Sequence, residues 1–283
     1  MIDTTLLSAP SSGGADNSAR LRQLNALPVF NPTATRILSL TDGSERCLTD
    51  LEQVFRADPG LTTELLISAN SAAFGGRARV STILHALALL GIDRVRSLAM
   101  TVAMSEYVRS NIPPQATSRI WAHAVATAVV AEELAHYSDG VSGSLLYTAG
   151  LMHDVGRLGL LANMKDLYQT FLNTEFLNIY ESEEVEKQSF GVTHSLAGEF
   201  LAEKWGFPLV LCDCCRSHHD LTETNGEEVG IIQTACIIAD GLGYPEMQVQ
   251  KRAKSVAADI WLDECAGNSM RESIKEKIQA FSL

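Results

Sequence analysis

A histidine and an aspartate stand side by side, as His153 and Asp154, at the end of an apolar run with the spacing of a helix. Leu145, Ala149 and Met152 share one face of that helix with His153, so the imidazole is expected to point into the core. A buried carboxylate without a partner is strongly disfavoured, so the pair needs either a metal or hydrogen bonds. For an isolated pair, hydrogen bonds are the commoner explanation.

Apolar positions elsewhere in the chain also recur with the period of a helix. Asp58 followed by Pro59 is typical of a helix start, and Gly91 is typical of a helix end. No stretch alternates apolar and polar residues for long enough to predict a strand. We therefore predict an all-α fold, in which a multi-helix bundle is preceded by an N-terminal helical subdomain.

Breaks in composition divide the chain into four predicted parts. Residues 1–20 form a flexible tail, 21–110 an N-terminal helical part, 115–245 a helical domain that carries the His-Asp pair, and 250–283 a C-terminal helix. The prolines in Ile112–Gln115 predict a hinge between the two larger parts. The segment Leu167–Gln188 is more polar than its neighbours, so we expect it to pack outside the core.

The charge balance disfavours some partners. The chain carries 34 acidic and 22 basic residues, a formal net charge of −12, so its surface repels nucleic-acid backbones and anionic membranes. No apolar run is long enough to cross a bilayer, and the N-terminus lacks the basic start and apolar block of a secretory signal. We expect a cytoplasmic protein with neither a nucleic-acid polymer nor a membrane as a main partner.

The cysteines are expected to be reduced thiols, as is usual in the cytoplasm. They are Cys47, Cys212, Cys214, Cys215, Cys236 and Cys265. The cluster Cys212–Cys215 lacks a second pair at the spacing of a zinc ribbon or finger, so a structural zinc site there is disfavoured.

Five histidines and two aspartates fall on helix faces that should point inward. They are His123, His153, Asp154, His194, His218, His219 and Asp240. Any one could be a core group held by hydrogen bonds, but seven in one helical domain favour a shared polar cavity that holds metal. Imidazole and carboxylate ligands suit Zn, Fe, Mn, Co or Ni and do not choose among them.

Seven ligands exceed the needs of one tetrahedral ion, so the sequence allows one or two divalent transition-metal ions, with Asp154 as the bridge. The candidate catalytic residues are Asp154 and Arg157. Arg157 lies one turn beyond the pair and could hold a phosphate as a bidentate donor. The alternative for Arg157 is a surface arginine at a helix end.

The order of His123, then His153-Asp154, then Asp240 resembles the HD superfamily of metal-dependent phosphohydrolases, whose four metal-ligand positions these residues match. His194 and His218-His219 resemble the second-metal ligands of its HD-GYP branch, which hydrolyses cyclic dinucleotides. The whole chain from Leu21 to Asp240 most resembles the HDOD proteins, a regulatory branch. The residues that carry this last resemblance are Leu27-Pro28, Asp58–Thr62, Ala69–Phe74, Leu89–Arg96, Gly150–Arg157, Phe190–His194 and Trp205–Pro208.

Two departures separate this chain from the catalytic branches. Gly243-Tyr244-Pro245 lies far from the His-Asp pair, so we interpret its match to the HD-GYP signature as coincidence. Arg157 stands where the catalytic branches usually have lysine, which keeps the charge but changes its geometry. HDOD proteins have often lost metal ligands, whereas this chain keeps them.

Three hypotheses follow from the sequence. The first is a signal-transduction protein with a metal-capable site that binds a signalling protein, a phosphate-containing small molecule or a nucleotide. The second is an active phosphohydrolase, a phosphodiesterase or nucleotidase that uses a metal-activated water. The third is a helical scaffold without metal, whose histidines are held by hydrogen bonds and water.

Overall fold

The computed structural model describes residues 17–40, 47–71, 79–112, 114–220 and 226–251, together with Ala258, Glu272, residues 274–276 and Gln279. Its helices are α1 (Asn17–Leu24), α2 (Pro32–Ser39), α3 (Cys47–Arg56), α4 (Pro59–Ala69), α5 (Ile83–Leu90), α6 (Ile92–Asn111), α7 (Pro114–Leu134), η2 (Ala135–Tyr137), α8 (Gly143–Met152), α9 (Val155–Asn163), α10 (Lys165–Leu172), α11 (Ile179–Phe190), α12 (His194–Lys204), α13 (Leu209–Ser217) and α14 (Glu227–Gly241). Two short strands, β1 (Glu175–Phe176) and β2 (Gln248–Val249), pair in parallel with Glu175 opposite Gln248. The predicted all-α fold is confirmed.

Several helices begin where the sequence provides a cap. The Asp58 carboxylate accepts a hydrogen bond from the Leu61 backbone N–H, and Pro59 is the first helical residue of α4. Ser142 caps α8 in the same way, and Thr193 caps α12. These caps fix where α8 and α12 start, which places His153 just after the end of α8 and His194 at the start of α12.

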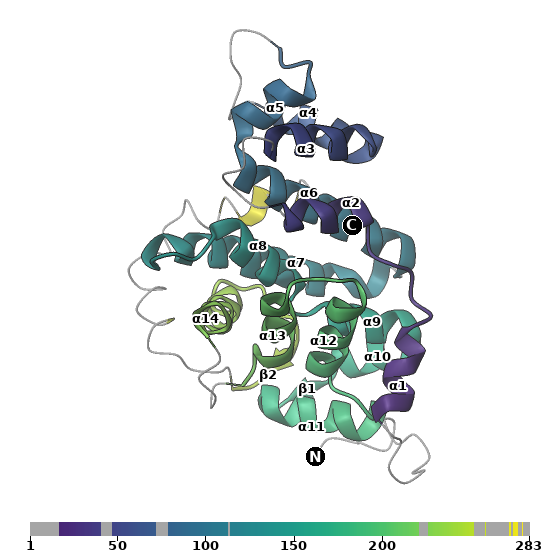
Figure 1. Cartoon of the computed structure of the whole chain (residues 1–283). Helices are drawn as coiled ribbons and strands as arrows, with labels where there is room; N and C mark the ends of the chain where they lie inside the picture. Colours follow the sequence, from purple (N-terminus) through teal and green to yellow (C-terminus); the bar gives the residue numbers. More distant parts are fainter. Residues whose placement is uncertain are drawn as a thin grey trace.

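The buried apolar side chains form two clusters. A smaller one joins α2, α3, α4 and α5 to the first half of α6, and a larger one fills the space among the remaining helices. Figure 1 shows α3, α4 and α5 together at one end of the molecule, with α6 between them and α7 and α8. The helix α6 takes part in both clusters, from Val95 and Ala99 in the smaller to Met100 and Met104 in the larger.

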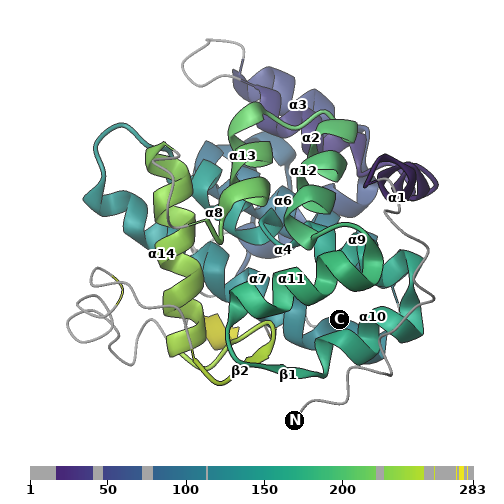
Figure 2. The ribbon, with the colours of Figure 1, turned by 90° about the horizontal axis from the view of Figure 1, so that it is seen from below.

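Two glycines bring helix backbones into direct contact around the His-Asp pair. A Cβ on Gly156 of α9 would lie 1.9 Å from the His194 carbonyl oxygen, and one on Gly150 of α8 would lie 2.7 Å from the Ala128 Cα of α7. Both distances are far inside contact range, so only glycine fits. The helices that carry His123, His153, Asp154 and His194 are therefore held close together (Figure 2).

The polar segment Leu167–Gln188 does not pack outside the core, and that prediction was wrong. It forms α10, β1 and most of α11, and Tyr168, Phe171 and Glu186 are fully buried. The rings of Phe171 and Tyr168 contact Phe190, so an aromatic cluster lies beneath this segment. Polar residues dominate its sequence because its other face is exposed to solvent.

The ends of the chain are described only in part. The predicted tail at 1–20 lies outside the described residues as far as position 16, and α1 begins at Asn17, so its last four residues are helical. Most of the predicted helix at 250–283 also lies outside them, although Ile274 is helical and buried. The division at 110–115 stays a prediction, while a helix boundary does fall there, between Asn111 and Pro114.

Among the described helices, none has both the length and the apolar character to span a membrane. The cytoplasmic location stays a prediction. Within the described residues, Cys47, Cys212, Cys214, Cys215 and Cys236 are free and buried, and Cys265 lies outside them. The Cys212 and Cys215 thiols face the carbonyl oxygens of Phe207 and Met152, so both contribute to packing of α13.

Candidate metal centre

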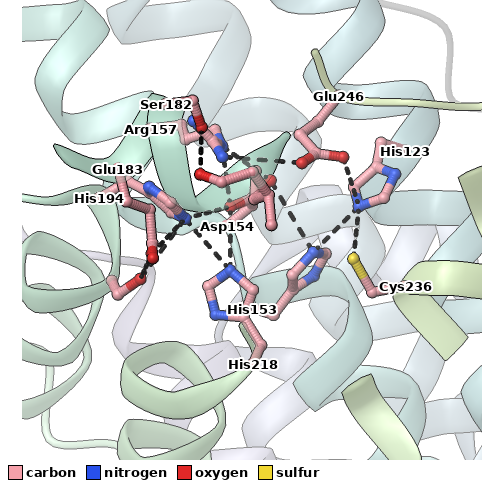
Figure 3. Close-up of polar contacts among 12 residues, drawn as sticks. His123, His153, Asp154, Arg157, Ser182, Glu183, His194, His218, Cys236 and Glu246 are labelled. Atoms are coloured by element: carbon pink, nitrogen blue, oxygen red, sulfur yellow. Dashed lines mark hydrogen bonds and ion pairs between the residues drawn. The ribbon is translucent and has the colours of Figure 1, made fainter. Parts of the chain in front are cut away.

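Residues from six elements converge on one buried place between α7, α8, α9, α12, α13 and α14, as Figure 3 shows. His123 comes from the middle of α7, His153 and Asp154 from the junction of α8 and α9, and His194 from the start of α12. His218 follows the end of α13. The exposed fractions of these five side chains are 0 to 2%. These five of the seven predicted ligands therefore lie together in the structure.

His123 and His153 face each other through the same ring nitrogen. Their Nε2 atoms lie 3.2 Å apart. The Nδ1 atom of His123 lies 2.7 Å from the Tyr244 carbonyl oxygen, and that of His153 lies 2.7 Å from the Gly150 carbonyl oxygen. A carbonyl oxygen only accepts, so both Nδ1 atoms carry a proton and, in a neutral ring, both Nε2 atoms are bare.

His194 and His218 repeat this arrangement on the other side of Asp154. Their Nε2 atoms lie 3.3 Å apart. His218 Nδ1 donates to the Cys215 carbonyl oxygen at 2.9 Å. His194 Nδ1 donates to the Glu186 carboxylate at 2.7 Å, and the same oxygen accepts the His194 backbone N–H. The second pair therefore also presents bare nitrogens to each other.

Two bare nitrogens at hydrogen-bond distance repel unless a cation lies between them. That cation is a proton or a metal ion. Metal-binding imidazoles usually donate their other N–H to a carbonyl or carboxylate, which fixes them in one tautomer. The four rings could thus hold a metal ion.

Asp154 lies between the two histidine pairs. Its Oδ1 is 3.6 Å from His194 Nε2 and 3.4 Å from His218 Nε2, and its Oδ2 is 3.8 Å from His153 Nε2. Burial raises the pKa of its carboxyl, but Arg157 and the histidines outweigh burial and hold that pKa well below its usual value. The ionised Asp154 has one oxygen near each histidine pair, which is the position of a carboxylate that could bridge two ions.

Arg157 is fully buried, so the alternative of a surface arginine is wrong. Its Nε donates to both oxygens of Asp154, at 3.1 and 3.2 Å. Its Nη1 lies 3.9 Å from Glu186 and its Nη2 3.7 Å from Glu246. Burial lowers the pKa of Arg157, yet these carboxylates, Asp154 first, raise it well above its usual value, so the guanidinium stays charged. Its role as a phosphate ligand stays a prediction.

The two remaining predicted ligands sit differently. His219 offers a nitrogen to the group of Asp154, His194 and His218, and among the described residues its buried Nε2 has no hydrogen-bond partner. Asp240 lies beside the other edge of His123, with its Oδ1 3.5 Å from Nδ1 rather than Nε2. The structure therefore brings His219 to the donor group around Asp154, whereas Asp240 lies beside the Nδ1 edge of His123, away from Nε2.

The histidines differ in the ease with which they take up a proton. Burial lowers the pKa of His153 and of His219 well below its usual value, and neighbouring imidazoles add to that effect. Burial also lowers the pKa of His123 and of His194, but nearby carboxylates outweigh it and leave both raised. The donor group of His123 and His153 therefore includes one ring that stays neutral, His153, and the group of Asp154, His194 and His218 gains another in His219.

Sequence reasoning missed three residues of the site. Glu186 holds His194, Glu246 places an oxygen 3.4 Å from His123 Nε2, and Cys236 places its sulfur 3.5 Å from that same nitrogen. Glu186 shares a helix face with the buried Ile179 and Phe190, which was a readable signal. Glu246 directly follows the Gly-Tyr-Pro tripeptide, whose Tyr244 carbonyl orients His123, so that tripeptide does belong to the site.

The donor atoms form three groups in which every atom lies within 4.8 Å of the others. One group is Asp154, His194, His218 and His219; the others are His123 with His153 and Cys236, and His123 with Asp154 and Glu246. Asp154 belongs to two of them. The described residues could thus hold two ions, one on each side of Asp154.

A pocket with a cavity volume of about 30 Å³ adjoins this centre. Residues of its lining that matter here are Tyr180, His218, His219, Cys236, Asp240 and Glu246. Among the described residues that line it there is no lysine or arginine. This space holds about two water molecules. Its charged side chains are acidic, which disfavours a bare phosphate unless a metal balances the charge.

The model of the HDOD domain family matches residues 27–221, and the chain belongs to this family. An uncharacterized protein from Treponema pallidum (strain Nichols) is 24% identical over 188 residues, or 66% of this chain and 36% of that protein. The chain thus spans about a third of the length of this relative.

Three solved structures have the same fold. An HDOD domain protein of unknown function from Geobacter sulfurreducens is 19% identical, with 94% of this chain and 95% of that one covered and a TM-score of 0.66. A proposed signal transduction protein from Marinobacter aquaeolei VT8 is 20% identical, with 99% and 66% covered and a TM-score of 0.67. A proposed phosphohydrolase from Shewanella amazonensis SB2B is 19% identical, with 96% and 90% covered and a TM-score of 0.64. At these identities the likeness shows the fold alone.

Proposed function

We propose that this chain is a signal-transduction protein that binds one or two divalent transition-metal ions and responds to their presence rather than hydrolysing phosphate. The observation that carries this proposal is the position of Arg157. Its guanidinium is fully buried and already faces Asp154, Glu186 and Glu246. Because Arg157 is fully buried and is not among the described residues that line the pocket beside the centre, it is not placed to balance charge on a phosphoryl group there, a task that phosphoryl transfer requires of some cation.

The route by which the metal centre acts on the rest of the protein is the helix α8. Its last residues precede His153, and its earlier residues pack on α6. The Thr101 and Tyr147 hydroxyls join the two helices by a buried hydrogen bond of 2.9 Å, and Ser144 donates to Asp93. Because α6 is part of the N-terminal core, a shift of α8 on metal binding reaches α3, α4 and α5. A signalling protein would bind the surface of α3, α4 and α5.

The second candidate is a phosphohydrolase with Asp154 as its central metal ligand. It is favoured by one observation: the described residues provide donors for two ions beside a pocket. In that case a phosphate-containing small molecule or a nucleotide would enter the pocket next to His218 and His219. The bound metal would supply Lewis-acid activation of water, and the ion would replace Arg157 as the phosphate ligand.

One experiment separates the two. The chelator-treated chain is loaded with Mn²⁺, Fe²⁺ or Zn²⁺, and its melting temperature and its turnover of cyclic dinucleotides and bis-p-nitrophenyl phosphate are measured. The proposal expects a metal-dependent rise in melting temperature that is lost in Asp154→Ala, with no turnover above that variant. Turnover that requires Asp154 would establish the second candidate instead, and absence of any metal effect would leave the scaffold hypothesis.

A further inference from the structure

We infer that Cys236 is a thiolate ligand of the metal that binds between His123 and His153, so that this half of the centre prefers thiophilic ions. This inference rests on the proposed metal centre and goes beyond it, because it fixes the donor atoms and the class of ion. Sulfur ligands favour Zn²⁺, Co²⁺ or Fe²⁺ over Mn²⁺ or Mg²⁺.

The first support is the direction in which the Cys236 side chain points. Its sulfur lies 3.5 Å from His123 Nε2, and the dashed line in Figure 3 joins these atoms. In the neutral ring His123 Nδ1 donates to the Tyr244 carbonyl and Nε2 is an acceptor, so the Cys236 S–H can donate to it. The sulfur thus lies on the side of His123 on which Nε2 would bind an ion.

The second support is the completeness of the donor group. The sulfur, a nitrogen of His123 and a nitrogen of His153 all lie within 4.8 Å of one another, and all three side chains are buried. An ion bound among them displaces the thiol proton, which leaves to water through the adjoining pocket that Cys236 lines. The product is an N₂S donor set with room for a further ligand.

The third support is the place of Asp240 on the same helix. Cys236 and Asp240 stand four residues apart on α14, so they share one helix face. Asp240 approaches Nδ1 of His123, at 3.5 Å, whereas Cys236 approaches Nε2 at the same distance. The face of α14 therefore presents sulfur, not carboxylate, to the ring nitrogen that binds metal.

Glu246 is the competing donor. Its Oε2 lies 3.4 Å from His123 Nε2, but its other oxygen faces Arg157 at 3.7 Å. Its carboxylate thus has an alternative cationic partner in Arg157. An oxygen donor and a sulfur donor give different spectra with Co²⁺, so the two can be told apart in solution.

The test is titration of the full chain with Co²⁺ after chelator treatment, followed by absorption spectroscopy. We expect visible d–d bands, which report bound ion, together with a near-ultraviolet thiolate-to-cobalt charge-transfer band. In Cys236→Ser the visible bands persist and the near-ultraviolet band is lost. In the matched control Cys214→Ser, which alters a buried thiol of α13, both remain. The ratio of Zn²⁺ to Mn²⁺ affinity should fall by about tenfold or more in Cys236→Ser.

A second measurement uses the unaltered chain, in case the serine variant folds poorly. Alkylation of Cys236 by iodoacetamide is followed by peptide mapping with and without Zn²⁺, and protection of Cys236 but not Cys214 is expected. Three results would overturn the thiolate ligand and leave the metal centre standing. They are visible bands without the near-ultraviolet band, a near-ultraviolet band that survives in Cys236→Ser, or alkylation of Cys236 at the same rate with and without Zn²⁺. Absence of any cobalt band would overturn the metal centre itself.

Discussion

Arg157 Nε donates to both carboxylate oxygens of Asp154, at 3.1 and 3.2 Å, and neither side chain is more than 2% exposed. The guanidinium of Arg157 also lies near Glu186 and Glu246. A buried charge that loses its partner is expensive, whereas a buried pair in good geometry is close to neutral in cost. Arg157 is therefore the internal cation that keeps the carboxylates of the centre ionised.

Replacement of Arg157 by glutamine should make the protein depend on metal for its stability. Without metal, the Arg157→Gln variant should lose about 3–5 kcal/mol of unfolding free energy, because its carboxylates have lost their cation. A bound Zn²⁺ or Mn²⁺ restores positive charge there, so the metal-induced rise in melting temperature should exceed that of the wild type. Equal rises in both would contradict this role. Arg216→Gln, which removes an exposed arginine paired with Glu199, is the control.

Glu186 should strengthen metal binding without touching the metal. Its carboxylate accepts from His194 Nδ1 and from the His194 backbone, and the Tyr168 hydroxyl donates to its other oxygen. The Glu186→Gln variant weakens the hold on the ring, so affinity should fall about 10- to 100-fold in a competition with a chelator. The matched control is Glu184→Gln on the exposed side of the same helix. An unchanged affinity in Glu186→Gln would show that His194 needs no such support.

Gly156 should tolerate no side chain, whereas Gly230 should. A Cβ at Gly156 would collide with the His194 carbonyl oxygen at 1.9 Å, while at Gly230 of α14 nothing lies within 4 Å. In urea unfolding, Gly156→Ala should lose about 3 kcal/mol or more. Gly230→Ala should gain up to about 1 kcal/mol because alanine favours a helix. A Gly156→Ala protein as stable as the wild type would refute the backbone contact of α9 with α12.

The buried thiol of Cys214 should make the protein less stable at alkaline pH. Burial first, and then the nearby acidic groups Glu228 and Asp213, raises the pKa of this thiol to about 12, from an ordinary 9.0. Folding favours the protonated thiol, and this contribution to the unfolding free energy is fully present below the pKa of the thiol in the unfolded chain. That contribution is lost as pH rises from about 9 towards 12. By linkage the loss at pH 10 is about 1.4 kcal/mol.

The comparison that isolates Cys214 is a difference between variants. Unfolding free energies of the wild type and Cys214→Ala are measured in urea at pH 7.5 and pH 10. The alanine variant should lose about 1.4 kcal/mol less than the wild type over this interval. The same loss in both would place the alkaline sensitivity in other groups.

Much of the centre could be predicted from helical periodicity. His153, His194 and Asp154 fall on stripes with apolar neighbours, and burial of such stripes is what drives helices together. The caps at Ser142 and Thr193 also follow from local sequence, because their hydrogen bonds reach only three residues along the chain. Features that depend on near neighbours in the sequence were therefore predictable.

The residues that support the ligands were harder to find. Glu186 shares a helix face with Ile179 and Phe190, but it lies in an acidic stretch that hides this signal, and its contacts with His194 and Tyr168 satisfy it in the core. Glu246 follows the end of α14, in a segment where no helical periodicity applies. Arg157 has the sequence of a helix-end arginine, and the carboxylates of nearby Asp154 and of Glu186 and Glu246 from distant segments hold it in the core. Long-range packing decides these positions, and a single sequence does not display it.

The most direct test of the metal centre is anomalous scattering at transition-metal absorption edges from crystals of the chain grown with Zn²⁺ or Mn²⁺. We expect a peak about 2.0–2.3 Å from the Nε2 atoms of His123 and His153 with Asp154 as a further ligand. A second peak is allowed among His194, His218 and His219. Crystals loaded with metal that give no peak there, with the His123 and His153 Nε2 atoms still 3.2 Å apart as found here, would contradict the account.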